Sequence, residues 1–318
     1  MNYQELVLLR FRESETHHKS FTQHLADTLG ISYDAAYRRI QGKAKLDVVE
    51  AMQLAKAGQF SLDDIMTAGT NSTALGKATT AVESMDSFSA YLTTMEQHLK
   101  NAGKNDVQWL YSAKDIPIFH HFNDTELCRF KIYVWMQLLS KEKQWQRFDS
   151  FHLPLEIKEK LKRNRALFEQ VDRLEIWNDT SISSSLQQID YYHEAGFIDH
   201  HMAMTLCNDL HELINHVEQQ LGDGYEIYYH ELLIMSNNSL LYKKEEPKAA
   251  FVTMTMLGYL QFTGSSILNK MHNFYQHQLT QATAISTASV KERAVFFNKM
   301  RQKINALEKS LERFNTSF

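Results

Sequence analysis

The sequence predicts a mainly α-helical fold in two parts: an N-terminal domain of five helices and a larger helical domain that contains a small antiparallel β-sheet. Only 11 glycines and 3 prolines occur in 318 residues, and this scarcity of helix breakers favours long helices. Apolar residues recur at helical spacing, as at Phe88, Leu92, Met95 and Leu99. Residues 225–263 depart from this spacing and indicate the three strands of the sheet.

The composition is that of a globular protein with a large core, since 43% of the residues are hydrophobic and 11% are aromatic. The 34 basic and 38 acidic residues give a net charge of -4, so nucleic-acid binding would need a local basic patch. Cys128 and Cys207 are far apart and lack the spacing of a metal site, which indicates two buried thiols. The sequence has neither a signal peptide nor a long apolar run, so we expect a cytoplasmic protein that does not enter membranes.

A change of composition divides the chain. Residues 1–67 form the predicted N-terminal domain. Besides the helices of residues 20–45, helices are expected from Tyr3 to about Arg12, after Asp47 and after Ser61. Residues 68–83 are rich in Thr, Gly and Ala and predict a linker. Residues 84–318 form the predicted helical regulatory and dimerisation domain.

Residues 20–45 predict two short helices joined by a tight turn. Ser20 and Gln23 have the spacing of a capping box, and apolar residues then repeat at helical spacing as far as Leu29. Gly30 follows directly, and a glycine there can adopt the left-handed conformation that ends a helix.

The second helix of this pair is predicted from Tyr33 to about Gln41, with Ser32 as its cap. Ala36 and Ile40 lie four residues apart and are expected to face the first helix. The opposite face is polar and aromatic, and the sequence that follows is basic. Four positive charges fall within eight residues without an acid among them, at Arg38, Arg39, Lys43 and Lys45. Such a charged helix end is suited to contact phosphates.

The order LA-x-x-LGIS-x-x-A-x-x-R-x-I-x-G in this stretch resembles the λ-repressor-like (XRE-type) helix-turn-helix proteins. The resemblance implies that the second helix enters the major groove of double-stranded DNA. Its implied base-reading positions are Tyr33 and Asp34, with Tyr37 and Arg38 one turn later, and the first helix would meet the DNA backbone at Thr22 and Gln23. The complete expected DNA-binding set is Thr22, Gln23, Ser32, Tyr33, Asp34, Tyr37, Arg38, Gln41, Lys43 and Lys45.

Segments of the larger domain resemble a subgroup of long-bodied bacterial helix-turn-helix regulators. They are AKDIPIFHHF, ELCRFKIYVW, LQQIDYYHEAG and ERAVFFNKM. This resemblance implies a regulator whose C-terminal part has no assigned ligand, and it carries no catalytic residues over to this chain.

The sequence offers no catalytic, metal-binding or cofactor-binding motif. His211 and His216 are five residues apart, one more than the spacing that lets two histidines on a helix share a zinc ion. Nucleophile-elbow, Walker and dinucleotide-binding motifs do not occur. We therefore expect a protein that is not an enzyme and that needs no cofactor.

Apolar residues near the C-terminus repeat with the spacing of a coiled-coil seam. They are Phe297, Met300, Ile304, Leu307, Leu311 and Phe314. The seam either packs against its own domain or joins two copies of the chain. A homodimer is expected on functional grounds, because one recognition helix reads only a few base pairs.

Aromatic and methionine residues near the predicted sheet form either an ordinary core or a cavity for a small-molecule effector. They are Tyr228, Tyr229, Met235, Met254 and Met256. The sequence as a whole predicts a sequence-specific DNA-binding transcriptional regulator. The alternative is a non-enzymatic regulatory adaptor whose N-terminal helices bind a protein.

Overall fold

The computed structural model describes residues 2–14, 20–58, 60–62, 65, 76–102, 107–140, 147–222, 224–232, 237–243 and 246–315. The chain divides into two compact units, Met1–Leu75 and Gly76–Phe318. Among the described helices, none combines the length and the apolar character needed to cross a membrane.

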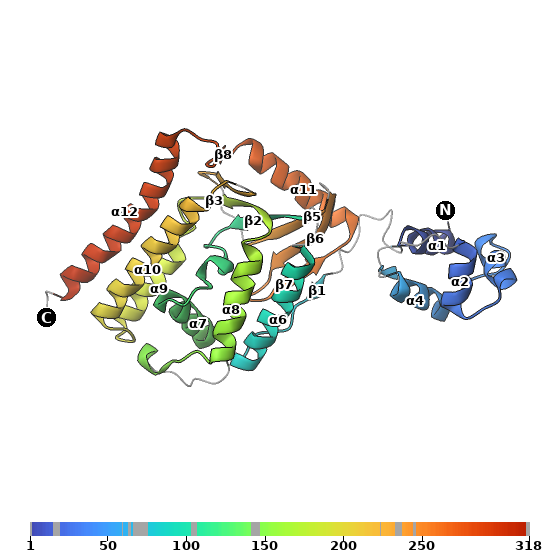
Figure 1. The fold of residues 1–318 in the computed structure, drawn as a ribbon, viewed down its shortest axis with the longest axis horizontal. Helices are drawn as coiled ribbons and strands as arrows, with labels where there is room; N and C mark the ends of the chain where they lie inside the picture. The colour runs from blue at the N-terminus through green and yellow to red at the C-terminus, as the bar shows by residue number, and fades with distance from the viewer. Residues whose placement is uncertain are drawn as a thin grey trace. The chain divides into compact units, whose positions relative to one another are not determined.

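The first unit contains four described helices around one small core (Figure 1). They are α1 (Tyr3–Glu13), α2 (Phe21–Leu29), α3 (Tyr33–Ile40) and α4 (Val48–Ala57). Asp47 and Glu50 form a capping box at the start of α4, the helix expected after Asp47. The helix predicted after Ser61 lies largely outside the described residues.

The outer face of α4 is apolar and open to solvent. Leu54 is fully buried, whereas Val48, Val49 and Met52 are 74%, 63% and 59% exposed. Apolar residues at helical spacing ordinarily mark a buried face, so the sequence of α4 does not predict this exposed surface.

The second unit is built on an eight-stranded mixed sheet, so the predicted mainly α fold with a small antiparallel sheet is wrong. The strand order is β1-β7-β6-β5-β2-β3-β4-β8. The strands are β1 (Lys77–Ala78), β2 (Val107–Ala113), β3 (Asp172–Trp177), β4 (Tyr225–Tyr229), β5 (Ser239–Lys243), β6 (Glu246–Thr253), β7 (Tyr259–Phe262) and β8 (Thr283–Ala284). Strands β2, β3 and β4 are parallel, and all other neighbours are antiparallel.

The sequence does not predict the two central strands β2 and β3, because both faces of each strand are covered by other parts of the protein. A strand buried on both sides lacks the alternation of polar and apolar residues that reveals a half-exposed strand. Strand β3 carries Arg173 and Glu175, which are only 4% and 0% exposed although charged residues ordinarily indicate a surface. Strand β4 was predicted in an antiparallel sheet with β5 and β6, but it pairs in parallel with β3. The linker predicted at residues 68–83 contains β1, which pairs with β7.

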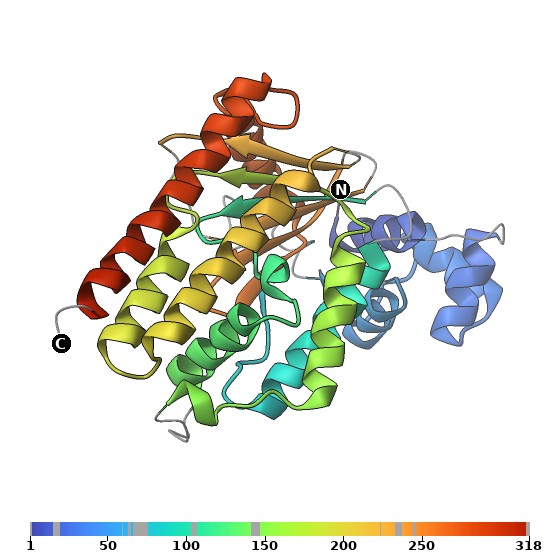
Figure 2. The ribbon, with the colours of Figure 1, turned by 60° about the vertical axis from the view of Figure 1, so that its left-hand side comes forward.

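The crossovers between the parallel strands are helical, as parallel pairing requires. Helices of the second unit are α6 (Met85–Ala102), α7 (Glu126–Leu139), α8 (Leu155–Phe168), α9 (Ser183–Glu194), α10 (His200–Gln219), α11 (Ser265–Thr280) and α12 (Val290–Asn315), with 3-10 turns η1 (Ile118–His121) and η2 (Phe148–Ser150). Trp109 and Tyr111 of β2 enter the large core formed with most of these helices. Leu110 enters the smaller core beneath α11. Figure 2 shows several of the helices in front of the sheet.

The predicted coiled-coil seam lies inside the second unit. Helix α12 packs along α10, and the two run side by side in Figure 1. Phe297, Met300, Ile304 and Leu311 are each at most 1% exposed. This face of α12 is therefore used for packing within its own domain and is not free to join two copies of the chain.

A cluster of polar side chains lies in the middle of the second unit, centred on the buried carboxylate of Glu175. His120 Nε2 lies 2.9 Å from Glu175 Oε1, and Oε2 accepts hydrogen bonds from Trp177 Nε1 at 2.7 Å and from the Tyr225 hydroxyl at 2.9 Å. Arg173 lies 3.9 Å from the same carboxylate. The carboxylate thus connects η1, β3 and β4.

Two opposing effects act on the pKa of Glu175. Burial raises the pKa, but electrostatic attraction and a hydrogen bond from His120, the charge of Arg173 and the Trp177 bond outweigh burial and lower it. Because the pKa is lowered in the folded protein, the carboxylate stabilises the fold above its ordinary pKa, and this contribution is lost as the pH falls through the lowered value.

We predict that Glu175→Gln lowers the free energy of unfolding of the second unit by about 3–5 kcal/mol at pH 7, because it leaves buried charge without its partner. The difference from the wild type should shrink as the pH falls from the ordinary pKa of a glutamate to the lowered pKa of Glu175, below which the folded wild-type carboxyl is also neutral. Urea unfolding followed at several pH values measures both effects. The exposed Glu194→Gln is the control, and equal stabilities of the two variants would show that the cluster does not hold the fold.

Candidate nucleic-acid interface

Helices α2 and α3 form the tight pair predicted for residues 20–45. Gly30 ends α2 with φ +66°, and the Ile31 amide donates to the Ala26 carbonyl at 3.0 Å. Ser32 then caps α3 by accepting from the Ala35 amide at 3.3 Å. Ala26 is nearly fully buried, and its small side chain permits the close crossing of the two helices.

The outward face of α3 carries the residues expected to meet bases. Tyr33 and Tyr37 are one helical turn apart and are 52% and 46% exposed. Asp34, Arg38 and Gln41 are also exposed, while Ala36 faces the core. The helix therefore presents aromatic rings and hydrogen-bonding groups to solvent, although tyrosines of a short amphipathic helix commonly help to fill a core.

Three of the four cations predicted at the end of α3 remain available for an anionic partner. Arg38, Lys43 and Lys45 are exposed, and none of them forms an ion pair with a described residue. Arg39 differs, because its guanidinium binds both oxygens of Glu50, at 3.0 Å and 2.5 Å. That bidentate pair joins α3 to the start of α4, and it makes Arg39 a structural residue.

The loop that carries Lys43 and Lys45 is fixed by backbone geometry and by Gln4. Gly42 adopts φ +69°, and the Lys43 amide donates to the Arg38 carbonyl at 2.8 Å. Such a bond closes the end of a helix after a left-handed residue.

The Gln4 side chain in α1 forms three bonds to the same loop. Its Nε2 donates to the carbonyls of Arg39 and Ala44, at 2.8 Å and 2.9 Å, and its Oε1 accepts from the Leu46 amide at 3.1 Å. No sequence pattern marks Gln4, because its partners are backbone groups about 40 positions away. The three bonds fix the position of the two lysines relative to α3.

The predicted backbone contacts of α2 are placed differently. Ser20 makes no side-chain capping bond, so the predicted capping box with Gln23 is wrong. Gln23 is exposed, and its Nε2 donates instead to Asp27 Oδ1 at 2.8 Å. Thr22 is half-buried beside it. Both residues lie in the first turn of α2, the helix that precedes the turn at Gly30.

No protein-family model, curated protein or solved structure matches this chain.

We predict that Gly30→Ala lowers the free energy of unfolding of the first unit by about 1–2 kcal/mol, because alanine resists the left-handed conformation. Space is not the cause, since a Cβ at this position would meet no atom within 4 Å. Gly30→Asn should cost less, because asparagine tolerates positive φ better. Denaturant titration of both variants measures the order, and equal losses would contradict the conformational explanation.

Proposed function

We propose that this protein is a sequence-specific DNA-binding transcriptional regulator and that its first unit docks on double-stranded DNA. The observation that carries the proposal is the surface of α3: an exposed aromatic and polar face that ends in three cations without a described acidic partner. A local arrangement of this kind can hold phosphates although the net charge of the chain is -4.

Each residue of the surface has a proposed role. Arg38, Lys43 and Lys45 bind phosphates and set the register of α3 on the duplex. Tyr33 and Tyr37 contact base edges or thymine methyl groups. Asp34 accepts a hydrogen bond from a cytosine amino group, the base donor that suits a carboxylate.

The remaining predicted residues orient the first unit on the DNA backbone. Thr22 and Gln23 lie on the helix that would cross the phosphates. Ser32 fixes the beginning of α3, since its side chain accepts from the Ala35 amide. Gln41 lies exposed at the end of α3, next to the cations. A hydrogen-bonding residue at that place can contact sugar or phosphate.

We further propose that the protein acts in the cytoplasm as a homodimer. A single α3 reads only a few base pairs, and two copies that bind adjacent half-sites supply the specificity that a regulator needs. The packed face of α12 does not provide the dimer contact, so the two copies meet through another surface.

A second function is favoured by the apolar face of α4. Val48, Val49 and Met52 are exposed side by side, and clusters of exposed apolar residues mark protein-binding surfaces. On this alternative the first unit is an adaptor that binds a protein. Replacing Val49 and Met52 with serine would abolish that association and leave a complex with DNA intact.

We predict that Arg38→Ala weakens DNA binding and lowers the slope of log affinity against log salt by about one unit, because one phosphate contact is lost. Lys56→Ala is the matched control, since Lys56 is an exposed cation of the same unit on α4. Affinity for selected genomic fragments, measured at two or more salt concentrations, gives the slopes. If Arg38→Ala binds like the control, α3 is not the DNA-contacting helix.

We predict that selection from genomic fragments by the intact chain enriches a shared motif and that Tyr37→Ala changes the base preference within it. The reason is that the proposed role of Tyr37 is to contact a base edge or a thymine methyl group, and loss of such a contact alters the discrimination between bases. Sequencing the fragments retained by wild type and variant provides the readout. Retention of fragments without a common motif would favour the adaptor function.

A further inference from the structure

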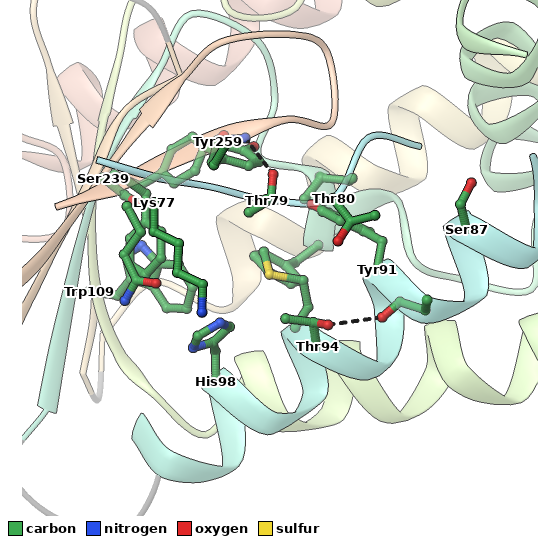
Figure 3. Close-up of a pocket in the computed structure, with 18 residues that line it drawn as sticks. Lys77, Thr79, Thr80, Ser87, Tyr91, Thr94, His98, Trp109, Ser239 and Tyr259 are labelled. Carbon is green, nitrogen blue, oxygen red and sulfur yellow. Dashed lines mark hydrogen bonds between the residues drawn. The ribbon is translucent and has the colours of Figure 1, made fainter. Parts of the chain in front are cut away.

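A cavity of about 290 Å³ lies inside the second unit, between α6 and the part of the sheet that includes β1 and β7 (Figure 3). Its walls include several aromatic side chains, among them Trp109 and Tyr111 from β2 and Tyr259 from β7. A cavity of this size and apolar character suits a small organic molecule. Tyr228 and Tyr229, which the sequence suggested for an effector cavity, do not line it.

Two buried donors at this cavity lack hydrogen-bond partners. Trp109 is 4% exposed and Tyr91 is 7% exposed, and neither the indole Nε1 nor the tyrosine hydroxyl bonds to another described group. An indole N–H can only donate, so it needs an acceptor. A buried donor without one destabilises the protein, and a ligand that brings an acceptor would remove this penalty.

Positive charge marks one end of the cavity. In Figure 3 Lys77 and His98 lie side by side, near Trp109. Burial and then the charge of Lys77 lower the pKa of His98, so the imidazole is neutral at pH 7 and Lys77 carries the charge. None of the described residues that line the cavity is acidic.

We propose that this cavity binds a small aromatic carboxylate. The carboxylate would accept from Lys77 Nζ and Trp109 Nε1 at the charged end. The flat apolar part would pack between the aromatic walls, towards Tyr91. Lys77 disfavours a cationic ligand at the same position, because like charges repel.

The cavity also touches the segment that leads out of the first unit. The Thr79 amide donates to the Tyr259 carbonyl at 2.9 Å, and the Tyr259 amide donates to Thr79 Oγ1 at 2.9 Å. Lys77 and Thr79 both line the cavity. A bound carboxylate would stabilise the pairing of β1 with β7, and this pairing begins directly after the first unit ends at Leu75.

The proposal that a bound carboxylate regulates DNA binding through the pairing of β1 with β7 rests on the proposed DNA-binding function. The proposal that the cavity binds a carboxylate does not. A ligand can regulate only if it favours one state over another. Here the two states are β1 paired with β7 and β1 released.

The binding test uses 2-naphthoate and its neutral isostere 2-naphthamide, titrated into the intact chain by calorimetry. We expect saturable binding of 2-naphthoate and binding of 2-naphthamide weaker by about tenfold, the scale of one charge-assisted hydrogen bond. Lys77→Gln should remove this preference for the anion. Trp109→Phe, which keeps an aromatic ring but removes the N–H, should weaken 2-naphthoate binding by about five- to tenfold.

Two matched controls keep the binding result interpretable. Lys248→Gln removes an exposed lysine of β6, and Trp135→Phe removes an indole N–H of α7; neither residue lines this cavity. Both variants should bind 2-naphthoate like the wild type. Failure of 2-naphthoate to bind, or equal affinities of the two probes in wild type and Lys77→Gln, would overturn the proposal.

The coupling test measures hydrogen exchange at the amides of residues 76–80 and the affinity for selected DNA, each with and without 2-naphthoate. We expect slower exchange at Thr79 and a changed DNA affinity. Slower exchange in a chain that binds no DNA would refute the DNA-binding function but support the site. Binding of 2-naphthoate with unchanged exchange would refute the coupling through β1.

Discussion

The buried carboxylate of Glu175 is the constraint on which the larger unit depends. It lies on the central strand β3 and accepts hydrogen bonds from the same strand and from β4, while His120 reaches it from η1. Arg173 completes the cluster and also donates to Gln220 Oε1, beyond the end of α10. A charge at this depth is tolerated only if its partners are in place. The cluster therefore fixes how η1 meets the parallel strands β3 and β4.

The structure of the smaller unit is determined mainly by local sequence features. Asp47 with Glu50, Ser32 before α3 and Gly30 after α2 each act within a few residues. Caps and a left-handed glycine depend little on distant parts of the chain. For this reason the sequence predicts the four described helices of the unit and the exposed face of α3. Gln4 is the exception, because its bonds join residues far apart in the chain and no periodicity reveals them.

Prediction failed where tertiary burial overrides local pattern. Strands β2 and β3 are covered on both faces. The charged residues Arg173 and Glu175 give the sequence of β3 a polar character, although both side chains are buried. The cavity was missed for a related reason: Trp109, Tyr91 and Lys77 come from separate elements, and only the tertiary arrangement of α6 and the sheet brings them together. The prediction for Arg39 was wrong in the opposite direction. The sequence places it in a cluster of free cations, but in the folded protein its charge is paired with Glu50.

The sheet ends on both sides in very short strands, β1 with two residues and β8 with two residues. A long exposed edge would offer a row of free amides and carbonyls to the strands of other molecules, and edges this short offer little of that template. The short edge strands thus leave the second unit little exposed to aggregation by extension of its sheet.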